Sequence, residues 1–290
     1  MSFEIYTDTA SNLGKKDANK YNLHLIHLPY FVNGKECTYT DLDSFDDKLY
    51  YYGLKNGIEV KTSQINPEKY IESFKKQLDE GKDILFIGLS SGVSGSFNSA
   101  RIAKEELAQQ YPDRKIVLFD SLGASLGIGL LVLRAVEYRN KGLSLEETAE
   151  KLKDHRERMY QIFIVDDLSH LHRTGRLSGA GKIIGTALGI RPVLKGSAEG
   201  KIVVQSKVRG RLGAIKTLAD KCINMITDKS VIGISYANCL DDAKRLIGLI
   251  KEKISVDNIL LVKHEPSTGS HLGSGALALY FEGHKGVRDC

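Results

Sequence analysis

Cysteine is scarce in this chain, and its pattern excludes two kinds of stabilising site. No cysteine belongs to a C-x-x-C pair, and the histidines lack the H-E-x-x-H spacing of a zinc site. We therefore expect neither a disulfide framework nor a structural metal. Cys222 falls on the apolar side of a helical pattern and is expected to pack in the core. The remaining cysteines are Cys37, Cys239 and Cys290.

Long apolar runs are also missing. No apolar stretch reaches the length needed to span a membrane. The first residues, Met1 to Glu4, lead straight into a strand-like segment instead of a basic region and an apolar signal core. We therefore expect a soluble protein of the cytoplasm.

The common nucleotide-binding motifs are absent as well. No G-x-G-x-x-G opens a helix after the first strand-like segment, and the main Ser/Gly loop lacks the Gly-Lys-Ser/Thr ending of a P-loop. The sequence also shows no cluster of carboxylates suited to Mg²⁺. We expect no cofactor, and any phosphoryl transfer would need a partner protein.

Strand-like and helix-like segments alternate along the chain instead. With 290 residues, 42% of them apolar, it can form two packed subdomains. We predict the α/β class with two α/β domains, residues 1–158 around a mainly parallel sheet and residues 159–290, with a ligand held between them. The predicted strands are 3–6, 84–89, 115–119, 160–165, 201–205, 231–236 and 259–262, and the predicted helices begin near 66, 98, 123, 144, 212 and 241.

The segment Ser90 to Ser96 gathers serines and glycines directly after an apolar strand-like run and ahead of a helix. Glycine permits close backbone approach, hydroxyls both donate and accept hydrogen bonds, and a helix N-terminus favours an anion. This serine loop, with the polar strand ends Thr7-Asp8 and Asp120-Ser121, predicts a carboxylate or phosphate site at one edge of the sheet.

The same loop allows an enzymatic alternative. Gly88 to Gly92 matches the G-x-S-x-G nucleophile elbow, with Ser90 as nucleophile, Asp120 as candidate acid and His271 as candidate base. An esterase or thioesterase is therefore one alternative function. Against it, the predicted helix begins several residues after the serine. A carrier of a small phosphorylated metabolite is the other alternative.

Two further hydroxyl-rich segments are candidate site loops. Thr62-Ser63-Gln64 precedes a helix start, and taken alone it indicates a capping turn. The segment Ser267 to Gly275 contains His271, whose ring can donate a hydrogen bond to an anion.

Positive charge is concentrated in residues 168–219, which hold ten Lys or Arg and a single acid, Glu199. This asymmetry attracts an acidic protein face or permits a transient contact with an anionic membrane, unless it is ordinary solvated surface. Few aromatics and no common nucleic-acid motif are present, so no nucleic-acid partner is expected.

Taken together, these segments resemble the DegV family of fatty-acid-binding proteins, some of which are the acyl-carrying subunits of bacterial fatty acid kinase. The resemblance spans nearly the whole chain. It is carried by Thr7 to Ala10, Thr62 to Gln64, Ser90 to Ser96, Asp120-Ser121, Leu171 to Arg176, Arg209-Gly210 and His271 to Gly275.

The resemblance implies a role for each of these segments. A long-chain fatty acid would lie between the two domains, its carboxylate held by Thr62, Ser94 and His271. The Gly95 amide could supply a further donor. The chain would be a carrier rather than an enzyme and would present the carboxylate to a separate kinase. Arg173, Arg176 and Arg209 are the expected docking residues.

Overall fold

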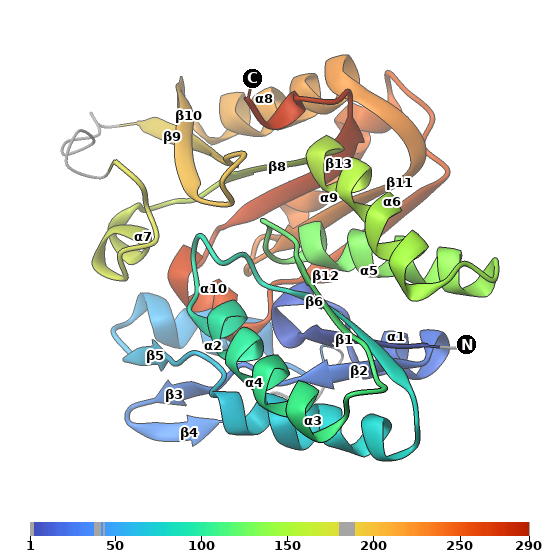
Figure 1. Cartoon of the computed structure of the whole chain (residues 1–290). Helices are drawn as coiled ribbons and strands as arrows, with labels where there is room; N and C mark the ends of the chain where they lie inside the picture. The colour runs from blue at the N-terminus through green and yellow to red at the C-terminus, as the bar shows by residue number, and fades with distance from the viewer. Residues whose placement is uncertain (1–2, 38–41, 43, 180–188, 290) are drawn as a thin grey trace.

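The structure is a computed structural model that describes residues 3–37, 42, 44–179 and 189–289. Its first half is built on a sheet in which all neighbouring strands are parallel, as predicted (Figure 1). The strands, in order across this sheet, are β2 (Leu23–Ile26), β1 (Phe3–Asp8), β6 (Asp83–Gly88) and β7 (Ile116–Asp120).

The second half is built on a larger sheet of mixed direction. Its neighbouring strands are antiparallel except for the pair β11 and β12. The order across the sheet is β10 (Ile202–Arg209), β9 (Ile190–Gly196), β8 (Met159–Ile164), β13 (Leu277–Gly283), β11 (Ile226–Tyr236) and β12 (Asn258–Lys263). The chain passes to this sheet after residue 158, and the division into domains there stays a prediction.

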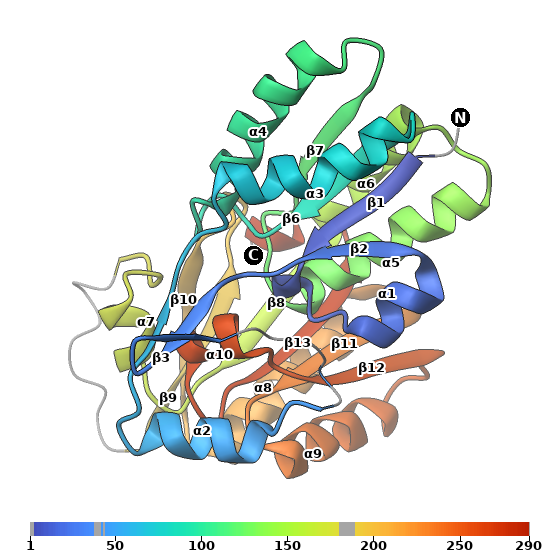
Figure 2. The ribbon, with the colours of Figure 1, turned by 90° about the horizontal axis from the view of Figure 1, so that it is seen from below.

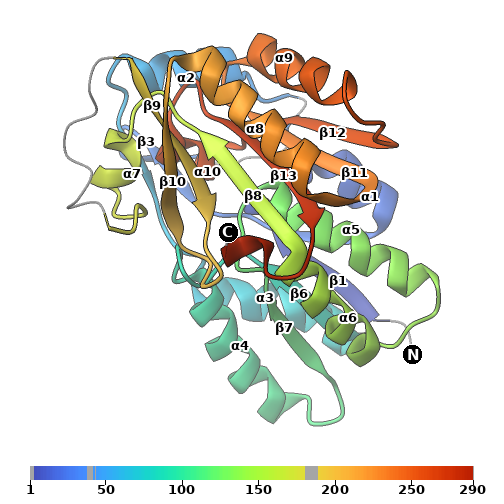
Figure 3. The same cartoon turned by 90° about the horizontal axis from the view of Figure 1, so that it is seen from above.

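Helices lie outside both sheets and between them. On the outer face of the parallel sheet are α3 (Pro67–Asp79) and α4 (Ser96–Gln110), while α8 (Arg211–Met225) and α9 (Leu240–Lys251) cover the outer face of the mixed sheet (Figures 2 and 3). Between the sheets, α5 (Leu126–Asn140) and α6 (Leu145–Arg158) contact strands of both. The predicted α/β class is confirmed. None of the helices in the described ranges has the length and apolarity to cross a membrane.

Helix α5 is the central element of this arrangement. Every residue from Leu126 to Val132 is buried, which is expected of a helix that is apolar on all sides. Two glycines let it approach its neighbours closely. A Cβ at Gly127 would lie 2.4 Å from the side-chain oxygen of Gln161, and one at Gly129 would lie 2.7 Å from the backbone oxygen of Ser11.

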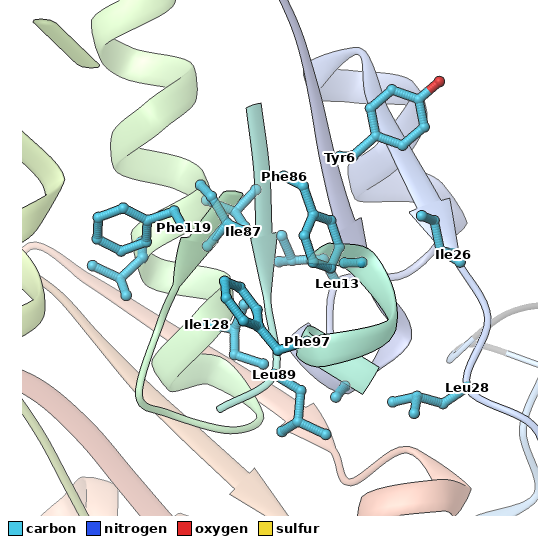
Figure 4. Packing of buried hydrophobic residues seen from close by; sticks show 14 of the residues in the cluster. Tyr6, Leu13, Ile26, Leu28, Phe86, Ile87, Leu89, Phe97, Phe119 and Ile128 are labelled. Carbon is cyan, nitrogen blue, oxygen red and sulfur yellow. The ribbon is translucent and has the colours of Figure 1, made fainter. Parts of the chain in front are cut away.

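The core of the first half surrounds strand β6. Figure 4 shows Phe86 of this strand near Phe97 of α4 and Ile128 of α5. Leu28 and Leu89 belong to the same buried cluster and also line the cavity described below. The packed core therefore continues directly into the wall of that cavity.

Several short elements were not predicted from the sequence. A third, antiparallel sheet consists of β4 (Lys35–Cys37), β3 (Tyr30–Val32) and β5 (Val60–Thr62). The unpredicted helices are α1 (Lys15–Tyr21), α2 (Asp47–Lys55), α7 (Ser169–Arg173) and α10 (Pro266–Leu272). Such short segments carry too few residues to show a hydrophobic period. As a correction, Thr62 ends a strand and His271 lies in a helix, although loops were expected at both.

The burial of α5 can be tested with two leucine substitutions. Leu131 in α5 is fully buried, whereas Leu212 in α8 is 59% exposed. We expect Leu131→Ala to lower the free energy of unfolding by about 2–5 kcal/mol through cavity formation. The control Leu212→Ala should change it by less than about 0.5 kcal/mol. Urea unfolding followed by circular dichroism measures both, and equal losses would contradict the central position of α5.

Candidate ligand-binding site

The ends of the parallel strands meet at one edge of the sheet, as predicted. The Asp8 carboxyl group accepts hydrogen bonds from the amides of Leu89 (2.8 Å) and Ala10 (3.1 Å). The hydroxyl of Ser121 donates to the Gly88 carbonyl (2.7 Å). Burial raises the pKa of Asp8 to about 7, and the two amides act against this increase. These bonds connect the start of the serine loop to both neighbouring strands.

A cavity of about 190 Å³ lies beyond this edge and is lined from both halves of the chain. Its wall combines the serine loop and the loop before α5 with residues of β8, β13, α10 and the hairpin between β9 and β10. The apolar side chains in this wall include Leu28, Leu89, Val93, Phe163, Ile202 and Leu272. An apolar wall with a few polar groups is typical of a small-molecule site.

Thr62 and His271 form a pair at this cavity, although they are far apart in the sequence. The Thr62 hydroxyl lies 2.9 Å from Nε2 of His271, and both residues line the cavity. Strand β5 places Thr62 and helix α10 places His271. The fold therefore brings together two of the predicted site residues.

The serine loop supplies the other predicted residues, Ser94 and Gly95, which line the same cavity. The Ser94 hydroxyl accepts from the Ser96 amide (3.2 Å) and donates to the Ser96 hydroxyl (3.0 Å). Ser96 in turn accepts from the amide of Ile65, in the segment after Thr62 (3.1 Å). These bonds hold the serine loop against that segment.

Gly95 is needed where the two segments touch. A Cβ at this position would lie 2.0 Å from the side-chain oxygen of Gln64, so any larger residue would displace Gln64. Gln64 also lines the cavity. Its contact with the serine loop was not predicted, because adjacency in space leaves no signal in a single sequence.

Burial keeps the His271 ring neutral. Burial first, and then the nearby positive charge of Arg176, lower the pKa of His271 to about 4. A neutral ring paired with a hydroxyl has one donor left over in either tautomer. If Thr62 donates to Nε2, the N–H is at Nδ1, and if Nε2 donates, the Thr62 O–H is left over. Within the described residues Nδ1 has no hydrogen-bond partner.

Helix α10 is oriented by Glu265, a buried residue that the sequence analysis did not select. Its carboxyl group accepts from the amides of Ser267 (2.7 Å) and Thr268 (2.5 Å) and caps the helix. Burial raises the pKa of this carboxyl group. The acid followed by Pro266 at the first helical position is a capping signal that could have identified the helix.

The three arginines expected to dock a partner differ in position. Arg176 lines the cavity, and its charge acts on His271. Arg173 and Arg209 are exposed, at the end of α7 and of β10. Arg173 lies 3.2 Å from the ring of His170. Lys182 of the basic segment lies outside the described residues.

Ser90 does not have the geometry of a nucleophile. It is fully buried, and its hydroxyl donates to the Gly200 carbonyl (2.8 Å) and accepts from the Gly92 amide (3.0 Å). His271, the candidate base, bonds to Thr62 instead. Asp120, the candidate acid, accepts from the Leu122 amide at the end of its own strand (3.0 Å). This geometry argues against the esterase alternative.

Metal-ligating side chains are not clustered in the described part of the chain either. Among the residues described, no group of three or more His, Cys, Asp or Glu side chains could hold a metal ion. The polar groups that face the cavity are hydroxyls, amides and imidazoles, together with Arg176 and Lys201. Such a set suits an organic ligand with a hydrogen-bonding end.

Fold and site together define an α/β protein with an apolar-walled cavity, lined from both halves of the chain, and a polar cluster at the sheet edge. The sequence model described as "Uncharacterised protein, DegV family" matches residues 2–283. The chain belongs to the DegV family. A DegV domain-containing protein of Clostridium perfringens is 34% identical to it over 287 residues, with 97% of each chain covered.

Two solved structures extend this comparison to three dimensions. One is a DegV family protein from Thermus thermophilus that is described as binding fatty acid. It has a TM-score of 0.88 at 26% identity, and the match covers 98% of this chain and 100% of the other. A fatty-acid-binding DegV family protein from Streptococcus agalactiae has a TM-score of 0.86 at 29% identity, covering 98% and 99%.

The protonation of His271 can be followed by NMR. In the ligand-free protein we expect its ring signals to titrate with a midpoint near pH 4, because burial opposes the charged form. His271→Gln identifies the signals by removing them. A midpoint close to the ordinary histidine value of about 6.5 would contradict the buried, neutral ring.

Proposed function

We propose that this protein binds one long-chain fatty acid, with its carboxylate at Thr62, Ser94, Gly95 and His271 and its tail in the cavity. The observation that carries the proposal is the Thr62–His271 pair at the edge of an apolar-walled cavity that the serine loop also lines. The fatty-acid-binding relatives from Thermus thermophilus and Streptococcus agalactiae share the fold and support it.

The chemistry of the two ligand ends fits the two kinds of wall. A carboxylate that leaves water needs several donors. The Thr62–His271 pair has one donor left over, the Gly95 amide is a second, and the Ser94 hydroxyl would be a third by turning from Ser96 to the ligand. Arg176 adds a positive charge on the same cavity. Each methylene of the tail contributes roughly 0.8 kcal/mol on burial. The apolar wall thus favours a fatty acid over a small phosphorylated metabolite, which has no tail to bury.

The protein would act as a carrier in the cytoplasm and present the bound carboxylate to a separate fatty acid kinase, which forms the acyl phosphate. The sequence holds no nucleotide loop, so the nucleotide would be bound by the kinase. The exposed Arg173 and Arg209 would contact the kinase, while Arg176 faces the bound acid.

The carboxylate site can be tested by comparing two serines of one loop. Ser94 lines the cavity, whereas Ser91 is exposed in the same loop. We expect Ser94→Ala to weaken stearic acid binding about tenfold or more, because a hydrogen bond to a charged group is lost. Ser91→Ala should leave the affinity within about twofold.

Isothermal titration of the delipidated proteins gives these affinities, and circular dichroism verifies that both variants fold. If the two substitutions have equal effects, the assignment of Ser94 is wrong. If the unsubstituted protein binds no long-chain acid, the proposed function is wrong.

The docking role of the basic residues has its own test. Arg173→Glu and Arg209→Glu should each lower the rate at which a fatty acid kinase phosphorylates the bound acid, by about fivefold or more at low loaded-protein concentration, because opposite charges at interfaces guide association. Acid binding itself should not change. Lys251→Glu, on the exposed side of α9, is the charge-matched control. Equal rates for all three variants would exclude this docking surface.

A further inference from the structure

A second cluster of polar side chains lies at the cavity and shares no hydrogen bond with the Thr62–His271 pair. Its centre is the buried hydroxyl of Ser235 on β11. That hydroxyl lies 3.1 Å from the Ser125 hydroxyl, 3.1 Å from Nε2 of His264 and 3.2 Å from the Tyr280 hydroxyl. The Ser125 hydroxyl also donates to the side-chain oxygen of Asn12 (2.9 Å), so toward a ligand it is an acceptor. Ser125, His264 and Tyr280 all line the cavity. The Ser235 hydroxyl has one hydrogen and two lone pairs, so three partners use its full capacity.

His264 is left with an unused polar atom. His264 is 1% exposed, and its Nδ1 atom has no hydrogen-bond partner in the part of the chain that is described. Burial lowers the pKa of His264 to about 3, so the ring is neutral at physiological pH. A neutral ring has one N–H and one lone pair, and Ser235 occupies only the Nε2 side. A buried polar atom without a partner is destabilising unless a ligand supplies that partner.

The position of this ring is fixed by its surroundings. The His264 amide donates to the Tyr236 carbonyl (2.8 Å), and its own carbonyl accepts from the Tyr51 hydroxyl (3.0 Å). Nε2 is held by Ser235. Because backbone and ring are both fixed, Nδ1 keeps one defined position on a residue that lines the cavity. Such an atom selects a ligand by the position of its polar group.

We propose that His264 Nδ1, with the hydroxyls of Ser125 and Tyr280, forms a second polar subsite that binds the hydroxyl of a hydroxylated fatty acid. This inference rests on the proposed function and names the class of acid within it. A hydroxyl both donates and accepts, so it can pair with either tautomer of His264. A second charged group would gain less, because a neutral ring offers it no opposite charge.

Two substitutions of His264 separate the two ring nitrogens. The amide of glutamine reaches the position of Nε2 and can keep the bond to Ser235, whereas the shorter amide of asparagine reaches the position of Nδ1. His264→Gln therefore removes the subsite, and His264→Asn is the matched variant that retains it. His264 is not one of the residues proposed to hold the carboxylate.

The experiment measures the affinities of stearic acid and of hydroxystearic acids with the hydroxyl at successive positions. For the unsubstituted protein we expect one positional isomer to bind about fivefold tighter than stearic acid, as one added hydrogen bond would give. His264→Gln should abolish this preference and leave stearic acid affinity within about twofold, and His264→Asn should retain most of it.

The possible failures are distinguishable. If stearic acid binds and every hydroxylated isomer binds more weakly to the unsubstituted protein, the subsite does not exist, and this holds whether or not the variants fold. If an isomer is preferred equally by the protein and by His264→Gln, the hydroxyl binds elsewhere and the assignment to His264 is overturned. If no long-chain acid binds, the proposed function itself fails.

Discussion

The burial of α5 between two sheets is the constraint on which the binding site depends. The first part of the helix, Leu126 to Val132, has no side chain exposed to water, and strands of both sheets pack against α5. The loop that precedes the helix is thereby fixed at the boundary between the two halves. Leu122 to Ser125 in this loop line the cavity. Packing that stabilises the fold thus also positions one wall of the site.

The polar part of the site is held by hydrogen bonds between segments that are distant in the sequence. Thr62 meets His271, and Ile65 meets Ser96. Thr62 ends β5, Ile65 follows it, Ser96 begins α4 and His271 lies in α10, so these bonds tie three parts of the chain together. The buried cap of α10 by Glu265 adds a local restraint to His271. This preorganisation lowers the ordering cost that a ligand would otherwise incur on binding.

Much of the fold followed from sequence patterns, but the detail of the site did not. The long helices and the buried parallel strands have strong periods, and the capping box of Ser144 and Glu147 is present. Segments such as β5 and α10 are too short for a period, so Thr62 and His271 were expected in loops. Their role was inferred from a family resemblance instead. The His264 network could not be predicted, because it depends on side chains from four elements or connections that only the folded chain brings together.

The hydrogen bond from Ser90 to Gly200 joins the serine loop to the turn between β9 and β10. The two segments are packed too closely at this junction to accept even a methyl group. A Cβ at Gly200 would lie 2.2 Å from the Ser90 hydroxyl, and one at Gly92 would lie 2.7 Å from the Gly200 carbonyl. The two segments therefore behave as one mechanical unit. A ligand that shifts the turn also shifts the serine loop, so changes made at opposite ends of a ligand would have non-additive effects on its binding free energy.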